Sequence, residues 1–260
     1  MIGSSSLLAR LLNSFAAVLL LTGCNRGVEP EVLQRFQEAQ QAFDRAENGD
    51  DFLVAAGLYQ QILDRGFVSG AVFYNQGNAL LRAGRRGEAI AAYRQAKRYR
   101  PRDPYLDANL QYALGNRPAA SQRRAVLDTL IFWQDWLGYP AVFRLMAAFA
   151  AATFAIGVAW LAFRRRALGW LAAAGAVLTL VAAFSAAYDW YRYEAITYGV
   201  VTASETVARK GNGESYEPAF TESLREGFEF RLVDRRGDWL MIRSPGGQEG
   251  WIEAKDTVVY

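Results

Sequence analysis

Two long apolar runs without a charged residue constrain the fold of this chain more than any other feature. They extend from Leu145 to Phe163 and from Ala167 to Tyr188, and only a triplet of arginines separates them. At a rise of 1.5 Å per residue, each run reaches roughly 30 Å as a helix, which is enough to cross the hydrocarbon core of a bilayer. The sequence therefore predicts a two-helix transmembrane hairpin over residues 145–188, with a hairpin buried in a soluble core as the alternative.

The triplet between the runs consists of Arg164, Arg165 and Arg166. Arginine concentrated in a short loop favours the cytoplasmic side of a membrane, so both flanks of the hairpin are expected on the outer side. No ionisable residue lies within either run, which argues against a transporter or a proton relay. Aromatic residues near both ends are typical of membrane interfaces: Trp133, Trp136, Tyr139, Trp160, Trp170, Tyr188, Trp190 and Tyr191.

Residues 1–23 read as an export signal, because Arg10 precedes an apolar stretch that is too short to span a bilayer. The sequence Leu-Thr-Gly-Cys that ends at Cys24 resembles a bacterial lipobox, whose cysteine becomes the diacylated first residue of the mature protein. Cys24 is the one cysteine of the chain. The alternatives are an ordinary signal peptide, or a buried helix that carries an incidental cysteine.

The segment 24–120 has a helical pattern with alanine-rich apolar faces and turn signals between them. Five of its residues, Gly77, Ala89, Tyr93, Ala96 and Pro101, resemble the small, small, aromatic, small and proline positions of a tetratricopeptide repeat. In such a repeat the small residues let two antiparallel helices approach closely, the aromatic residue fills their core, and the proline stops the second helix. The sequence therefore predicts a repeat over residues 70–103.

An earlier, degenerate repeat is expected over residues 35–68. Ala55 and Tyr59 reproduce the small and aromatic positions one repeat length upstream, although Phe43 replaces a small residue. Asp103 is expected to cap a further, solvating helix that extends to about Leu114.

Repeats of this kind bind extended peptides in a concave groove. Tyr74, Asn78 and Arg82 are spaced four residues apart and share one helix face, which offers stacking, amide hydrogen bonds and a charge-assisted bond to a carboxylate. We therefore expect an acidic or C-terminal peptide there, with a solvated helix face as the alternative.

A basic cluster lies on and after the second helix of the same repeat: Arg94, Lys97, Arg98, Arg100 and Arg102. That side of a repeat is normally convex, so we expect a solvated face. Contact with anionic lipid headgroups is the functional alternative.

Short runs of β-forming residues alternate with turns across residues 194–260, which favours a small all-β barrel. The segments 207–211, 226–227, 237–239 and 250–252 resemble the first strand and loop, the Glu-Gly, the Gly-x-Trp and the Gly-Trp-Ile of bacterial Src-homology-3 (SH3) domains. Some relatives of that domain bind peptidoglycan peptides.

The aromatic residues near the loop of this barrel are its candidate ligand contacts. Tyr216, Phe220 and Trp239 are the candidates we retain, whereas core packing is the expected role of Trp251 and Phe230.

No catalytic constellation is evident in the sequence. The chain has no histidine, no cysteine besides Cys24 and no glycine-rich phosphate loop, and Asp50 and Asp51 fit helix capping. We therefore expect no enzyme, cofactor or metal, and no dense basic stripe argues for nucleic acid.

The order of lipobox, tetratricopeptide repeat, linker (121–144), membrane hairpin and SH3-like barrel resembles the BatE-type family of the bacterial aerotolerance (Bat) system. The resemblance implies a non-enzymatic scaffold in the inner membrane with its soluble parts in the periplasm. It also implies envelope proteins, including von Willebrand factor A-type membrane proteins, as partners. The alternative is an envelope anchor in which the barrel binds peptidoglycan and the repeats are secondary.

Overall fold

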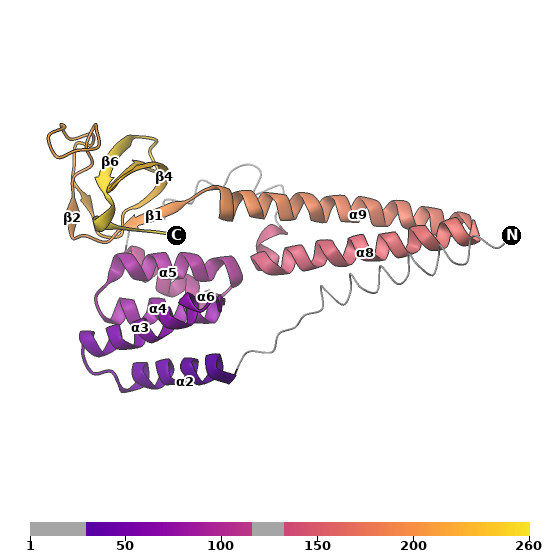
Figure 1. Ribbon diagram of the computed structural model, residues 1–260, viewed down its shortest axis with the longest axis horizontal. Helices are drawn as coiled ribbons and strands as arrows, with labels where there is room; N and C mark the ends of the chain where they lie inside the picture. The colour runs from indigo at the N-terminus through magenta and orange to yellow at the C-terminus, as the bar shows by residue number, and fades with distance from the viewer. Residues whose placement is uncertain (1–29, 116–132) are drawn as a thin grey trace.

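The computed structural model describes residues 30–115 and 133–260. The chain is mostly helical, with a small antiparallel sheet at its C-terminal end and two long helices that extend away from the rest (Figure 1). We call residues 30–115 the helical unit, residues 139–190 the hairpin and residues 198–260 the β unit. The export signal, Cys24 and the first part of the expected linker lie outside the described residues.

The helical unit consists of five antiparallel neighbours in sequence order: α2 (Pro30–Arg45), α3 (Gly49–Asp64), α4 (Gly70–Arg82), α5 (Arg86–Tyr99) and α6 (Pro104–Leu114). Its core is built from alanines and two fully buried tyrosines, Tyr59 and Tyr93. Small residues allow the helix axes to approach, and the tyrosine rings fill the space that remains.

Polar caps fix where these helices begin. Asn48 and Asp51 form a reciprocal capping box at the start of α3, so the expected capping role is confirmed for Asp51, whereas Asp50 lies in the first turn without a capping bond. Ser69 caps α4 by accepting a hydrogen bond from the amide of Val72. Asp103 caps α6, and that helix ends at Leu114 as the sequence predicts.

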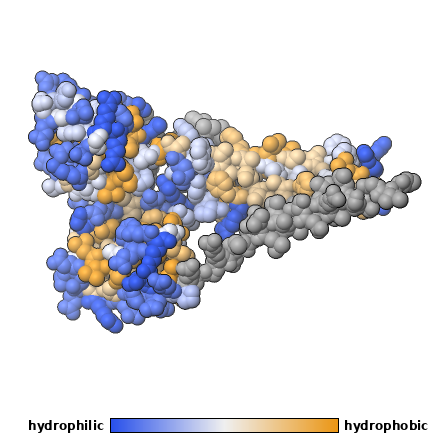
Figure 2. All heavy atoms as spheres, in the orientation of Figure 1, coloured by the Kyte–Doolittle hydropathy of each residue, from blue (hydrophilic) through white to orange (hydrophobic). Residues whose placement is uncertain are grey.

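The hairpin is formed by α8 (Tyr139–Phe163) and α9 (Arg166–Trp190), preceded by the short helix η1 (Gln134–Trp136). Both helices are long and apolar enough to cross a membrane, and their apolar side chains are largely exposed (Figure 2). Each helix is longer than its apolar run. Helix α8 already starts at Tyr139, within the expected linker, and α9 ends at Trp190.

The two helices of the hairpin meet through small and hydroxyl side chains. Thr153 and Thr179 are hydrogen-bonded across the pair at 3.1 Å, and an added Cβ at Gly175 would lie 2.6 Å from the hydroxyl of Thr153. Close contact of this kind is how helices associate in lipid, where water drives no burial. At the turn, Arg164 adopts the left-handed conformation with a φ of 51°.

The β unit contains a five-stranded antiparallel sheet in the order β6-β5-β4-β1-β7 and a separate pair, β2 with β3. The strands are β1 (Tyr198–Val201), β2 (Glu205–Thr206), β3 (Leu224–Arg225), β4 (Glu229–Arg236), β5 (Trp239–Arg243), β6 (Glu249–Glu253) and β7 (Thr257–Val259). Leu240 and Ile242 of β5 are buried and lie opposite Ile252 and Leu232, so alternate side chains of each strand form one core.

One element of the expected β unit differs. Residues 207–211, which we expected to begin with a strand, form no strand; Arg209 instead makes isolated bridges to Pro218 and Trp251. The strand that does open the unit is β1, which pairs with β4 and with the C-terminal β7. The sheet is therefore extended beyond β1 by β7, and not by residues 207–211.

Candidate functional site

One face of helix α5 joins the three parts of the molecule. Gly87, Ile90, Arg94 and Arg98 are spaced three and four residues apart, so their side chains share one face of the helix. The first three face the β unit, and Arg98 faces the connection that leads from α9 to β1, which includes the π-helical turn η2 (Tyr191–Ala195). We call this face and its partners the α5 seam.

At the start of α5, the backbone itself contacts the β unit. The amide of Gly87 donates a 2.8 Å hydrogen bond to the Glu226 carboxylate, and a Cβ at Gly87 would lie 2.5 Å from the carbonyl oxygen of Val201. Only glycine permits this approach. A carboxylate at a helix N-terminus also interacts favourably with the helix dipole. One turn later, Ile90 is fully buried and lies against Gly227.

The centre of the α5 seam is a buried ion pair. Arg94 donates two hydrogen bonds to Glu229, of 2.6 Å from Nε to Oε1 and 2.8 Å from Nη2 to Oε2. The hydroxyl of Tyr260, which directly follows β7, donates a 3.2 Å hydrogen bond to the same carboxylate. The exposed fractions of the two charged side chains are only 17% and 8%, so water scarcely screens the pair.

Burial and charge act in opposite directions on Arg94. Burial by itself lowers the pKa of the guanidinium, but the hydrogen bonds and the negative charge of Glu229 outweigh it, so the pKa is raised and Arg94 stays cationic. Burial, followed by the charge of Glu229, raises the pKa of Tyr260, so its hydroxyl keeps the proton that it donates. Arg94 and Tyr260 thus both keep the protons that they donate to Glu229.

At the end of α5, the seam reaches the hairpin. Arg98 donates a 2.8 Å hydrogen bond to the carbonyl of Tyr193, and its guanidinium lies 5.4 Å from the centre of that ring. Tyr193 packs edge-on against Tyr139 at the start of α8, with 5.4 Å between ring centroids. Gly138 lies directly against the backbone of Tyr99, where a Cβ would meet the carbonyl oxygen at 2.5 Å.

The prediction that the basic cluster forms a solvated face is therefore wrong for Arg94 and Arg98. The β unit and the connection from α9 cover both residues. Among the remaining members, Lys97 donates to the carbonyl of Pro101 at 2.6 Å, Arg100 pairs with Asp103, and Arg102 lies over a tryptophan ring. A local pattern shows that a helix face is charged, but it cannot show which distant segment covers it; the partners of Arg98 and Arg94 are 95 and 135 residues away.

The three groove candidates lie on α4, and two of them are bound within the chain. Asn78 accepts hydrogen bonds from the Tyr93 hydroxyl at 2.8 Å and from Asn109 of α6 at 2.9 Å, and Asn109 also donates to the Tyr74 hydroxyl at 3.1 Å. Arg82 is exposed, with its guanidinium 5.2 Å from the centre of the Phe52 ring. Of the three, only Arg82 is exposed; Tyr74 and Asn78 are partly buried.

The five residues that resemble repeat positions lie where α4 meets α5. A Cβ at Gly77 would lie 2.6 Å from the ring of Tyr93, while Ala89, Tyr93 and Ala96 are fully buried. Burial raises the pKa of the Tyr93 hydroxyl, which donates to Asn78. Pro101 follows the end of α5 at Tyr99.

The candidate ligand contacts of the β unit occupy different environments. Phe220 packs against the core, Trp239 is half-buried on β5, and Tyr216 is exposed with its ring over Gly211. Trp251, expected in the core, is buried and lies 5.2 Å from the Arg236 guanidinium.

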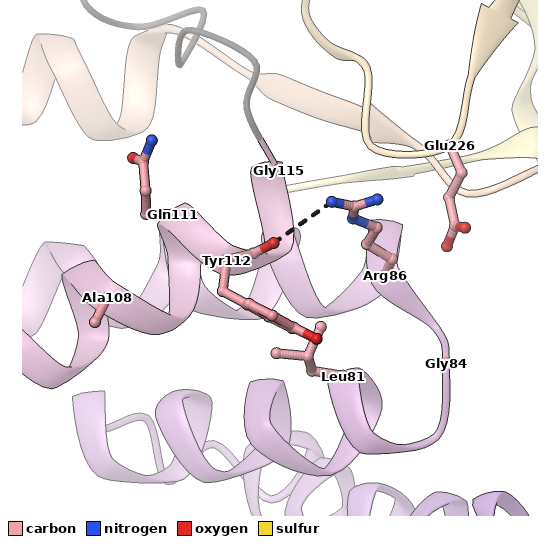
Figure 3. Close-up of a pocket in the computed structure, with 8 residues that line it drawn as sticks. All are labelled: Leu81, Gly84, Arg86, Ala108, Gln111, Tyr112, Gly115 and Glu226. Atoms are coloured by element: carbon pink, nitrogen blue, oxygen red, sulfur yellow. Dashed lines mark hydrogen bonds between the residues drawn. The ribbon is translucent and has the colours of Figure 1, made fainter.

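An open cleft of about 760 Å³, which the sequence did not predict, lies between the helical unit and the β unit (Figure 3). Arg86 lies on its wall and donates to the carbonyls of Ala113 and Tyr112 near the end of α6, the second bond measuring 3.4 Å. The full lining consists of Leu81, Gly84, Arg86, Ala108, Gln111, Tyr112, Gly115 and Glu226. In the sequence, this cleft is marked by an arginine that follows a turn glycine, and that pattern is too common to predict a cleft.

Within residues 30–115 and 133–260, no group of three or more His, Cys, Asp or Glu side chains could hold a metal ion. No family model matches the chain. A search of curated proteins also found no match.

Proposed function

We propose that this chain is a non-enzymatic membrane scaffold, in which a tetratricopeptide-type helical unit and an SH3-like β unit are held in one orientation on a membrane hairpin. The observation that carries the proposal is the α5 seam. One helix contacts the β unit through Arg94 and the base of the hairpin through Arg98. Such an arrangement suits a protein that presents two binding surfaces at a set distance from a membrane.

The seam also bears on the topology that we propose, with residues 24–144 and 189–260 outside and residues 164–166 inside. Because α5 and the β unit share a buried ion pair, both must lie on the same side of any membrane that the hairpin crosses. A two-helix hairpin satisfies this requirement, since it returns the chain to the side from which it came. The export signal and the arginine triplet favour the same orientation.

The proposed scaffold resembles BatE-type proteins of the aerotolerance system. From that resemblance we propose a location in the bacterial inner membrane, with the soluble parts in the periplasm and a lipid on Cys24. The partners that it suggests are envelope proteins, including von Willebrand factor A-type membrane proteins. The groove residue best placed to meet such a partner is Arg82, because its guanidinium is exposed.

A second candidate function is that of a peptidoglycan-binding anchor. The observation in its favour is the exposed ring of Tyr216, which packs over Gly211. The backbone carbonyl of Tyr216 accepts a 2.9 Å hydrogen bond from Arg209, which holds this loop in place. An ordered, exposed aromatic ring can stack on a sugar or a peptide.

Affinity purification of the tagged chain from solubilised membranes separates the two functions. The scaffold predicts that defined membrane proteins co-purify and that Arg82→Ala reduces their recovery. The anchor predicts that muropeptides co-purify and that Tyr216→Ala removes them. Recovery of muropeptides without partner proteins would contradict the scaffold.

A further inference from the structure

The end of the hairpin near the helical unit carries a belt of positive charge and aromatic rings. We call it the hairpin base, and it comprises η1, the start of α8, the end of α9 with η2, and the turn between α5 and α6. Its exposed cations are Arg102 and Arg144, and its rings include Trp136 and Tyr193. The mechanism of the scaffold leaves this belt without a role.

The depth of these residues follows from the apolar runs. Arg144 directly precedes the run that begins at Leu145, and Arg192 follows the end of the second run at Tyr188 by one turn. Since α8 and α9 pack side by side and antiparallel, Arg144 and Arg192 lie at the same end of the hairpin (Figure 1). In a hairpin that spans a bilayer, this end lies at the level of the headgroups.

The helical unit reaches the same level. The Arg102 guanidinium lies 5.0 Å from the centre of the Trp136 ring, which is itself more than half exposed. Trp136 belongs to η1, immediately before α8, so this contact places Arg102 beside the membrane-facing end of the molecule. Tryptophan and arginine are the side chains that favour this interface, because each has an apolar body and a polar tip.

The anionic groups of the hairpin base do not balance these cations at the surface. Asp189 is only 2% exposed and Asp103 pairs with Arg100, whereas the side chain of Glu194 is 48% exposed and lies 3.9 Å from Arg98. On α8, Val142 is buried whereas Arg144, two residues on, is exposed. Among the side chains that the structure describes, the base therefore exposes two cations, Arg102 and Arg144, against one anion, Glu194, next to two apolar helices.

We propose that the hairpin base binds the headgroup of an anionic phospholipid, with Arg102 and Arg144 as its phosphate contacts and Trp136 at the level of the glycerol backbone. This inference rests on the proposed membrane hairpin and identifies the ligand at its outer end. A guanidinium binds a phosphate through paired hydrogen bonds, and the neighbouring apolar helix holds the acyl chains. The bound lipid would fix the depth of the helical unit and, through the α5 seam, that of the β unit.

The test uses the full chain reconstituted in phosphatidylcholine vesicles that contain spin-labelled phosphatidylglycerol or spin-labelled phosphatidylcholine. The measured quantity is the preference of protein-contacting sites for the anionic lipid, by electron spin resonance. The arginines at the hairpin tip also attract anionic lipid, so all variants are made in a chain that carries R164Q, R165Q and R166Q. In that chain, each of the substitutions R102Q and R144Q should reduce the preference for phosphatidylglycerol over phosphatidylcholine by about fivefold. The double variant R102Q/R144Q should therefore show little preference.

The matched control is R45Q/R235Q, which removes two exposed arginines from α2 and β4 and should leave the preference unchanged. An equal loss in both double variants, or none in R102Q/R144Q, would overturn the proposed lipid site. Carbonate extraction of the same vesicles tests the hairpin separately. Release of the chain from neutral vesicles would refute the membrane hairpin and the lipid site together, whereas retention without lipid preference would refute the lipid site alone.

Discussion

Breaking the ion pair at the centre of the α5 seam should separate the β unit from the helical unit. In Arg94→Ala, the carboxylate of Glu229 remains buried and loses both of its guanidinium hydrogen bonds. Removing one partner of a buried pair typically costs about 3–5 kcal/mol, because the other charge is left uncompensated. An exposed pair would cost less than about 1 kcal/mol. Because both side chains are largely buried, we expect the larger of these two costs for this pair.

A double variant distinguishes loss of the pair from loss of packing. Arg94→Leu with Glu229→Met replaces both charges with apolar side chains of similar size, so no buried charge is left without a partner. We expect the double variant to cost less than either of its own single variants, Arg94→Leu and Glu229→Met, giving a coupling energy of at least about 2 kcal/mol in magnitude. The hydroxyl of Tyr260 would lose its acceptor in the double variant, which costs about 1 kcal/mol.

The assay is hydrogen exchange of the full chain in a membrane mimetic, followed by mass spectrometry. Amide exchange in α5, β1 and β7 reports the free energy with which the seam opens, while exchange in α2 and α3 serves as an internal control. The reasoning is refuted if the two single substitutions and the double one are additive, or if Arg94→Ala changes the opening free energy of β1 by less than about 1 kcal/mol.

Four further predictions test other parts of the molecule. A phosphatase reporter fused after Tyr260 should be active; an inactive one, with an active cytoplasmic reporter at the same place, would contradict the topology. Cys24→Ser should abolish labelling by a palmitate analogue but leave the chain in the membrane fraction, because two spanning helices bind far more strongly than a lipid chain. Arg82→Ala should weaken capture of a partner protein by roughly ten- to a hundredfold through loss of a charge-assisted hydrogen bond, whereas Arg45→Ala should not; equal effects would refute the groove assignment. Gly87→Ala should accelerate amide exchange in β1, because its Cβ would meet a β1 carbonyl at 2.5 Å, and unchanged exchange would show that the approach is not tight.

Arg45 is a better control for Arg82 than Arg98, because Arg98 has a structural role. From the sequence, Arg98 is the obvious control for Arg82, since it lies on the opposite, basic face of the repeat. In the structure, Arg98 holds the carbonyl and the ring of Tyr193. Its removal would loosen the helical unit from the hairpin and so affect capture indirectly. Arg45 lies at the exposed end of α2, so Arg45→Ala removes the same charge without loosening that contact.

Features that depend on neighbours in the chain could be predicted from the sequence alone. The two apolar runs predicted the long helices, because apolar length is a local property. Asp51 and Asp103 were assigned to helix caps correctly, since a cap bonds to amides only a few residues away. The β-rich character of residues 194–260 was also evident, because β-forming runs and turns are visible in their own residues.

The tertiary structure alone decided what covers each face. Arg94 and Glu229 are separated by 135 residues, and neither carries a local sign that it will be buried. Asn109 likewise reaches Tyr74 and Asn78 from another helix, which leaves Arg82 as the one groove candidate with its polar group exposed. The physical reason is the same in both cases. A charged or polar side chain is stable either in water or beside a complementary group, and its own sequence neighbourhood does not tell which of the two the folded chain provides.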